Sequence, residues 1–165
     1  KLEFLVAAIT RAEKSGAKIL LDGRKAKAPT GYEGGYWLGP TVLDQVTPDS
    51  EAATIELFGP ILSIVRTKGL KEALEIENKN PYGNAASVFT NTGGVADFIA
   101  ANAKAGMIGV NIGVPVPREP FSFGGINASK FGHGDITGAN SIGFWTNMKK
   151  VTTKWQTQND GNWMS

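Results

Sequence analysis

A carboxylate and an aromatic side chain, Glu56 and Phe58, stand two residues apart in the stretch Ile55–Ile61, directly before an apolar run. In an extended backbone the two would point to the same side, because successive side chains of a strand alternate. A carboxylate can accept hydrogen bonds from both hydroxyls of a ribose, and an aromatic face can pack against a flat nicotinamide. The plainer interpretation is an acidic surface residue and a core phenylalanine at a Gly59-Pro60 turn. Taken alone, the stretch favours that plainer interpretation and leaves the nucleotide contact open.

A second stretch that could do chemistry runs from Gly106 to Gly134, where an apolar run gives way to a loop rich in proline, glycine and phenylalanine. A strand that ends in a stiffened loop with aromatic side chains is a common way for α/β proteins to form a binding-site wall. Proline restricts φ and so lowers the entropy lost when such a loop is ordered. Phe121 and Phe123 are the candidate side chains of that wall. A surface loop punctuated by turn residues fits the composition equally well.

The remaining motifs are weaker. His133 is the only histidine of the chain, and no carboxylate-rich cluster stands near it at metal-ligand spacing, so we expect no metal site. The glycines around it resemble a dinucleotide-binding turn only superficially, because they follow a loop and the third glycine is displaced. A glycosylation sequon at 127–129 has no secretion signal to accompany it, and we expect a cytoplasmic protein.

Composition limits the class of protein. The chain has 165 residues, of which 41% are hydrophobic and 19% charged, as is typical of a soluble globular domain. A net charge of +2 without an arginine-rich stripe argues against nucleic-acid binding, and no run approaches the roughly 18 apolar residues of a membrane span. The sequence contains no cysteine, which excludes disulfides and a cysteine nucleophile within these residues. Because Lys1 begins in the middle of a helical pattern, we expect a fragment of a longer protein.

The elements that would position these residues follow from periodicity and turn signals. Apolar residues at helical spacing predict helices over 2–14, 70–79 and 95–103. Strands are expected over 18–21, 36–46, 61–65, 85–90 and 107–112. The segment 36–46 contains Pro40 and therefore suits an edge strand or an extended segment, whereas 61–65 suits a strand covered on both faces. An acidic helical turn is expected at 48–53.

From 61 to 112 the elements alternate as βαβαβ, which predicts parallel strands with right-handed crossovers and an α/β layer architecture. The end of the chain differs. We expect a short strand over 142–145 and a lysine-rich strand over 148–156, which either protects a sheet edge or pairs with another subunit. A polar tail at 157–165 is expected to have little order.

Several motifs then carry a resemblance to a known family. They are Glu56-Leu57-Phe58-Gly59-Pro60, Asn80-Pro-Tyr-Gly-Asn84, Gly106–Asn111 and Phe123-Gly124-Gly125. Their order and spacing resemble the C-terminal part of an aldehyde dehydrogenase, over nearly the whole chain. Within that superfamily, three further segments are similar to the CoA-acylating methylmalonate-semialdehyde dehydrogenases: 110–117, 120–125, and the ending 143–146 with 151–155.

The resemblance implies NAD-dependent oxidation of malonate or methylmalonate semialdehyde, with the acyl group passed from a cysteine thioester to coenzyme A. It places Glu56 at the nicotinamide ribose, Phe58 near the nicotinamide ring, and Phe123 with Phe121 along the substrate pocket. It makes residues 1–145 the C-terminal portion of the three-layer catalytic domain. Residues 146–165 become an oligomerisation strand and tail, with 148–156 joining another copy in a homo-oligomer.

The departures from the family define what this chain lacks. With no cysteine present, the resemblance puts the nucleophile outside these residues, together with the cofactor-binding domain and the groups that grip the substrate carboxylate. We therefore expect no catalytic residue within the chain and no activity from it alone. Two alternatives stay open: a hydrolytic NAD(P)-dependent aldehyde dehydrogenase, and a non-catalytic assembly module of the same fold.

Overall fold

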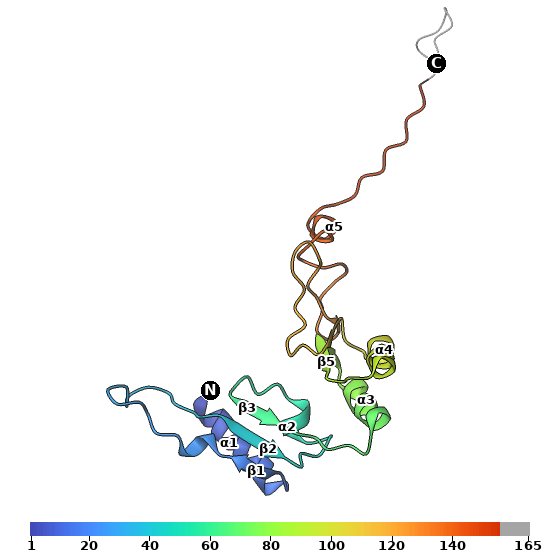
Figure 1. Ribbon diagram of the computed structural model, residues 1–165. Helices are drawn as coiled ribbons and strands as arrows, with labels where there is room; N and C mark the ends of the chain where they lie inside the picture. The colour runs from blue at the N-terminus through green and yellow to red at the C-terminus, as the bar shows by residue number, and fades with distance from the viewer. Residues whose placement is uncertain (156–165) are drawn as a thin grey trace, which may run out of the picture. The chain divides into compact units, whose positions relative to one another are not determined.

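A computed structural model describes residues 1–155, and the chain divides into two units (Figure 1). The first unit comprises Lys1–Pro81 and Thr92–Lys104, and the second comprises Tyr82–Asn91 and the residues from Ala105 onward. The predicted tail 157–165, and Gln156 at the end of the predicted terminal strand, lie outside the described residues. No helix within residues 1–155 is long and apolar enough to cross a membrane.

The first unit contains a three-stranded sheet in the order β1 (Lys18–Leu21), β2 (Thr41–Asp44), β3 (Ile61–Ser63). Strand β1 pairs antiparallel with β2, and β2 pairs parallel with β3. Helix α1 (Leu2–Lys14) buries one apolar stripe, as its period predicts. The core beneath it is formed by Ile9, Ala12, Leu43 and Val46. The short elements η1 (Gly23–Lys25) and α2 (Glu51–Thr54) complete this sheet-and-helix part of the unit, α2 where an acidic turn is expected.

Two strand predictions need correction here. The segment 36–46 was expected at an edge because of Pro40, but β2 is the central strand of its sheet. The proline does not interfere because it lies one residue before the ladder, whose first donor is the Thr41 N–H to the Pro60 carbonyl at 2.8 Å. Strand β3 is shorter than predicted and lies at the sheet edge, and its Leu62 is 59% exposed rather than covered on both faces.

Helices α3 (Leu70–Lys79) and α4 (Gly93–Asn102) also belong to the first unit. Helix α3 ends just before Asn80-Pro81, since the residue before a proline avoids the helical region. One side chain joins the two helices at their C-terminal ends. The Asn78 amide nitrogen donates to the Asn102 carbonyl at 3.0 Å, and its oxygen accepts from the Lys104 N–H at 2.7 Å.

The second unit is built on two short strand pairs. Strand β5 (Ala85–Val88) pairs parallel with β6 (Met107–Val110), and β4 (Tyr82–Gly83) pairs antiparallel with β7 (Ile126–Asn127). The chain passes through α4 between β5 and β6. The predicted α/β fold with parallel strand pairing is therefore confirmed. The predicted βαβαβ arrangement, however, placed the segment 61–65 in one sheet with the two later strands. In the structure β3 pairs with β2 instead.

The segment 142–145 was predicted to be a strand, and this was wrong. It lies in a short helix, α5 (Ser141–Trp145). The Ser141 hydroxyl donates to the Gly138 carbonyl at 2.7 Å, and the Phe144 N–H donates to the Asn140 carbonyl at 3.2 Å. These local hydrogen bonds outweigh the β-preference of the aromatic and β-branched residues, because that preference depends on a partner strand.

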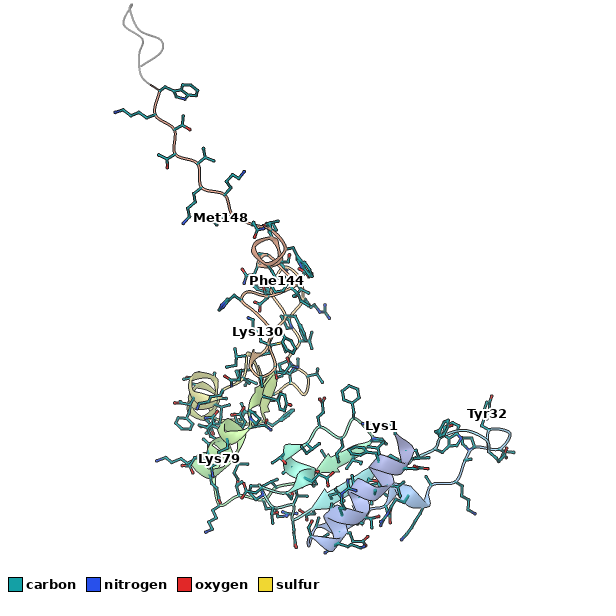
Figure 2. The ribbon with its side chains drawn as sticks, turned by 180° about the vertical axis from the view of Figure 1, so that it is seen from behind. Lys1, Tyr32, Lys79, Lys130, Phe144 and Met148 are labelled. Atoms are coloured by element: carbon teal, nitrogen blue, oxygen red, sulfur yellow. The ribbon has the colours of Figure 1, made fainter. Side chains whose placement is uncertain are left out.

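Residues 147–155 follow α5 and are assigned neither helix nor strand. Figure 2 shows Phe144 within α5 and Met148 directly after it. The side chains of this segment are exposed, Trp155 to 91%. Pairing of 148–156 with a second subunit, and the division of the chain at 145, stay predictions.

Candidate functional site

Glu56 and Phe58 flank a buried anchor in the first unit. Leu57 packs against Leu5 and Ala8 of α1 and is buried, whereas Glu56 is exposed and Phe58 is 77% exposed. No other described residue forms a hydrogen bond to the Glu56 carboxylate. The segment thus holds one side chain inward and presents a carboxylate and an aromatic ring to the outside, next to each other in the chain.

Phe58 departs from the extended backbone on which the sequence argument was based. Its φ is +55°, in the left-handed region that bulky residues rarely adopt. Such a conformation costs on the order of 1–3 kcal/mol and persists only where the surroundings impose it. Both neighbours of Phe58 lie against α1: Leu57 packs on Leu5 and Ala8, and a Cβ on Gly59 would lie 2.6 Å from Leu5 Cδ1. The packing of α1 therefore fixes the turn that displays the Phe58 ring.

In the second unit, Asn111 organises the carboxyl ends of β5 and β6. Its N–H donates to the Val88 carbonyl at 2.8 Å, which adds one step to the parallel ladder. Its side-chain amide then binds both backbone groups of Thr90, accepting from the N–H at 2.8 Å and donating to the carbonyl at 2.9 Å. Asn111 has a φ of +56°, which asparagine tolerates better than most residues. Asn111 ends one of the family motifs, but its sequence neighbours indicate no role for it, because its side-chain partner, Thr90, lies 21 residues away.

The loop after Asn111 encloses a hollow of about 380 Å³ over β6. The hollow is lined by the whole of that strand and by the loop residues Ile112, Pro115, Val116, Pro117 and Ser122. A hollow of this size is within the range of small-molecule sites, and it extends along β6 to the loop at its carboxyl end, the side on which α/β proteins bind ligands. The binding-site wall stays a prediction, and Ser122, between the two candidate rings, lines the hollow.

Phe121 and Phe123 are 70% and 37% exposed and follow this loop. Behind them the backbone passes very close to the start of β6. A Cβ on Gly106 would lie 2.5 Å from the Gly124 carbonyl oxygen, and one on Gly125 would lie 2.9 Å from Asn84 Cα. These glycines are needed for the close approach of two backbones. The rings are therefore exposed while the segment that carries them is tightly packed.

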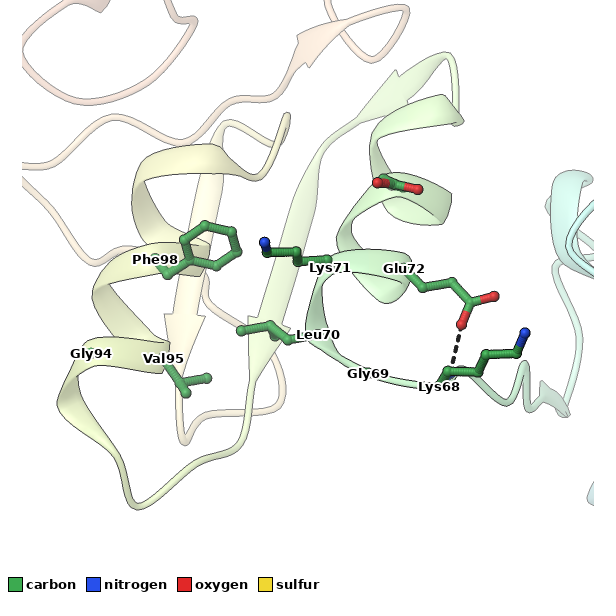
Figure 3. Close-up of a pocket in the computed structure, with 9 residues that line it drawn as sticks. Lys68, Gly69, Leu70, Lys71, Glu72, Gly94, Val95 and Phe98 are labelled. Carbon is green, nitrogen blue, oxygen red and sulfur yellow. Dashed lines mark hydrogen bonds between the residues drawn. The ribbon is translucent and has the colours of Figure 1, made fainter.

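A second hollow, larger than the one over β6, lies in the first unit. It has a volume of about 860 Å³ and opens between the N-terminal ends of α3 and α4 (Figure 3). Leu70, Val95 and Phe98 face into it, and the Glu72 carboxylate accepts from the Lys68 N–H at 2.6 Å at its border. None of the predicted site residues lines it. That hydrogen bond joins the first turn of α3 to the residue before its N-cap, Gly69.

Three carboxylates with a lowered pKa are each held by a cation. Arg66 binds both oxygens of Asp44, each at 2.8 Å, and lowers the pKa of that carboxyl. The Arg24 guanidinium, hydrogen-bonded to Asp22, lowers the pKa of Asp22 to about 2. Lys130 lowers the pKa of Asp135 at 2.9 Å. A carboxylate stabilised as an anion in this way fastens the chain and does not exchange protons near neutral pH.

Among the described residues, no group of three or more His, Cys, Asp or Glu side chains could hold a metal ion. The four predicted site residues fall into two pairs: Glu56 and Phe58 in the first unit, Phe121 and Phe123 in the second. The roles of all four stay predictions. Sequence reasoning missed the hydrogen bonds of Asn111, which join the carboxyl ends of β5 and β6.

Comparison with known proteins agrees with the motifs. The model of the aldehyde dehydrogenase family matches residues 1–151. The human mitochondrial methylmalonate-semialdehyde/malonate-semialdehyde dehydrogenase [acylating] is 41% identical over 148 residues, which are 90% of this chain and 28% of that protein. The chain therefore spans less than a third of the length of this relative.

Solved structures give the same result. The methylmalonate-semialdehyde dehydrogenase from Oceanimonas doudoroffii superposes with a TM-score of 0.90 at 37% identity, over 95% of this chain and 32% of its own. An aldehyde dehydrogenase from Mycobacterium tuberculosis, solved in complex with NAD⁺, superposes with a TM-score of 0.80 at 26% identity, over 96% of this chain and 31% of its own.

Proposed function

The chain belongs to the aldehyde dehydrogenase family, and we propose that it works as the C-terminal portion of an NAD-dependent, CoA-acylating dehydrogenase for malonate or methylmalonate semialdehyde. The observation that carries this proposal is the 41% identity, over 90% of the chain, to a relative named for both semialdehydes and for acylation. The cytoplasmic location predicted from the sequence stays a prediction, since that relative is named as mitochondrial.

The residues of the first unit fit a nicotinamide cofactor. The Glu56 carboxylate is exposed and has no hydrogen-bond partner among the described residues, and the exposed Phe58 ring is fixed next to it by the buried Leu57. An unpaired carboxylate suits the two hydroxyls of a ribose, and a bare ring suits a flat heterocycle. NAD, when bound, supplies the acceptor for the hydride that leaves the aldehyde carbon. Glu56 would hold the ribose and Phe58 would orient the ring.

The residues of the second unit fit the substrate side. Phe121 and Phe123 present apolar surface beside the hollow over β6, and the loop 112–122 forms its mouth. An aromatic wall orients the short carbon chain of a semialdehyde and excludes water from it. The thiolate that forms the thioester, and the thiol of coenzyme A that accepts the acyl group, come from outside these residues.

Assembly belongs to the same proposal. Residues 148–155 are exposed, and β-forming residues alternate with lysines along them. They pair with no strand of the described chain. Their unmet backbone groups suit pairing with a sheet of another copy. We therefore expect a homo-oligomer in which 148–156 is a shared strand.

The function is tested by assaying the complete polypeptide that carries this sequence. With NAD and either semialdehyde it should form NADH, and with coenzyme A it should form the matching acyl-CoA, detected by mass spectrometry. NADH formation with release of the free acid, even when coenzyme A is present, would identify the hydrolytic alternative. No NADH with any aldehyde would favour the assembly module. The 165-residue chain alone should give no NADH above background, because it contains no cysteine.

A further inference from the structure

A short segment in the second unit lies against the backbone that carries the two candidate wall residues. This segment, residues 135–140, is called the brace below. The Ala139 N–H donates to the Pro120 carbonyl at 3.2 Å, and the Thr137 hydroxyl accepts from the Phe123 N–H at 3.0 Å. Between these bonds the backbone of the brace runs very close to residues 120–122, because a Cβ on Gly138 would lie 2.7 Å from the Pro120 carbonyl oxygen.

Asp135 forms the other end of the brace. Its Oδ1 would be only 2.5 Å from a Cβ placed on Gly124, the residue directly after Phe123. Lys130 binds Oδ1 at 2.9 Å, and the Asn140 amide reaches Oδ2 at 3.5 Å. The carboxylate is thus fastened on one side and touches the Phe123 segment on the other.

We propose that Asp135 and Thr137 are positioning residues that set substrate selectivity by fixing the Phe123 ring in the pocket. This inference rests on the proposed function, and it adds residues to which neither sequence motif nor family resemblance gave a role. The physical basis is that the backbone near Phe123 is held in place while the side chains it carries are exposed. The Phe123 N–H donates to Thr137 and Asp135 lies against Gly124, while the rings of Phe121 and Phe123 stay exposed.

Such an arrangement favours discrimination. A pocket separates two substrates that differ by one methyl group only if its wall does not yield to the larger one. A wall residue on a fixed backbone meets this condition, whereas one on a loose loop moves aside. Malonate and methylmalonate semialdehyde differ by one methyl group, so their relative use reports directly on the stiffness of the wall.

The test uses the complete enzyme and the substitution Thr137→Val, which keeps the shape and removes the acceptor for the Phe123 N–H. The ratio of kcat/KM for the two semialdehydes should move about three- to tenfold towards unity, chiefly through KM. Thr137→Ser keeps a hydroxyl and should restore the wild-type ratio. Asp135→Asn keeps the size, loses the charge, and should shift the ratio in the same direction.

Thr146→Val is the matched control. The Thr146 hydroxyl likewise binds the backbone, donating to the Ile142 carbonyl in α5, and it forms no hydrogen bond with residues 120–124. It should leave the ratio unchanged. If Thr137→Val lowers kcat/KM for both semialdehydes equally, with the ratio constant, Thr137 is only structural and the proposal is wrong.

A second measurement does not depend on activity. Hydrogen exchange of the peptide that contains residues 121–125 should be at least about threefold faster in Thr137→Val than in wild type or Thr146→Val, because the Phe123 amide has lost its acceptor. An unchanged exchange rate would show that Thr137 does not hold the Phe123 amide, and the proposal would be wrong even if the enzyme were active. If exchange responds but the complete polypeptide oxidises neither semialdehyde, the proposed function fails, and the selectivity role fails with it while the brace stands.

Discussion

The two units of this chain are stabilised by different means. The first has an apolar core in which Ile9 and Leu43 expose none of their surface, closed by α1 over the sheet. In the described part of the second unit, Met107 is the one hydrophobic residue that is buried. There the backbone is held by polar side chains instead, chiefly Asn111, Asp135 and Thr137.

This difference separates stability from placement. Apolar burial supplies most of the free energy of folding but has no directional preference. A hydrogen bond between a side chain and the backbone contributes only about 0.5–1.5 kcal/mol, yet it fixes distance and direction. The first unit therefore stabilises a turn that displays Glu56 and Phe58, and the second positions Phe121 and Phe123 with little core of its own.

The largest single-residue effect should come from the first core. Leu43→Ala removes a side chain with no exposed surface from the central strand and should lower the free energy of unfolding by about 2–5 kcal/mol. Leu62→Ala makes the same change on the neighbouring strand, at a residue that is 59% exposed, and should cost less than about 1 kcal/mol. Urea unfolding of the 165-residue chain, followed by circular dichroism, gives both values. Similar losses for the two variants would show that the core is not where the structure places it.

The next effect concerns assembly. Deleting residues 148–165 from the complete polypeptide removes the backbone groups proposed to pair with another subunit. Losing several such hydrogen bonds should weaken association at least about tenfold, before cofactor binding at Glu56 changes. Light scattering at decreasing protein concentration measures this directly.

A point substitution sharpens the same prediction. Proline has no N–H to donate, so Thr152→Pro should weaken assembly as the deletion does, while Thr152→Ala should not. A deletion variant that keeps its native mass at low concentration would mean that the strand folds within its own subunit.

A smaller effect on stability should come from the ion pair between Asp22 and Arg24 in the first unit. The pKa of Asp22 is lowered to about 2 by Arg24, whose guanidinium also binds Thr10 and Glu13 of α1. In the unfolded chain an aspartate titrates near about 3.9. Because the folded pKa is the lower one, the stabilisation is fully present above about pH 4 and is lost as the pH falls towards 2.

The difference in melting temperature between wild type and Asp22→Asn should therefore be largest above pH 4 and should shrink as the pH falls from 4 to 2. Melting curves by circular dichroism at several pH values measure this. A difference that stays constant over that range would mean that the Asp22 charge contributes nothing to folding.

Local signals were sufficient for much of the fold. The helix over 2–14 follows from apolar periodicity, and the end of α3 follows from Asn80-Pro81. The strand at 18–21 and the parallel pairing of 85–88 with 107–110 were also predicted correctly. Each of these depends on neighbours in the sequence or on a pattern that repeats within one element.

The errors arise where distant contacts decide. Pro40 indicated an edge strand, but only the pairing with Pro60 shows that the proline precedes the ladder. Residues 142–145 have β-preference, but no described strand pairs with them, and local hydrogen bonds make them helical. Preference without a partner does not determine a strand.

The candidate site divides in the same way. Residue types made Glu56, Phe58, Phe121 and Phe123 candidates, and the family resemblance gave them their roles. The contacts that hold them could not be read from the sequence. The two neighbours of Phe58 pack on Leu5, more than 50 residues earlier, and the Phe123 N–H binds Thr137 across 14 residues. A sequence shows which side chains could do chemistry more readily than what positions them.

The central claim is that the first unit serves the cofactor and the second serves the substrate. Steady-state kinetics of Glu56→Gln and Phe123→Ala in the complete enzyme tests it most directly. Glu56→Gln should lose about 1–2 kcal/mol, seen as a higher KM for NAD or a slower hydride step with an unchanged KM for the semialdehyde. Phe123→Ala should raise the KM for the semialdehyde and leave that for NAD unchanged. If both variants change the same parameter, or if Glu56→Gln changes none, the division of roles is wrong.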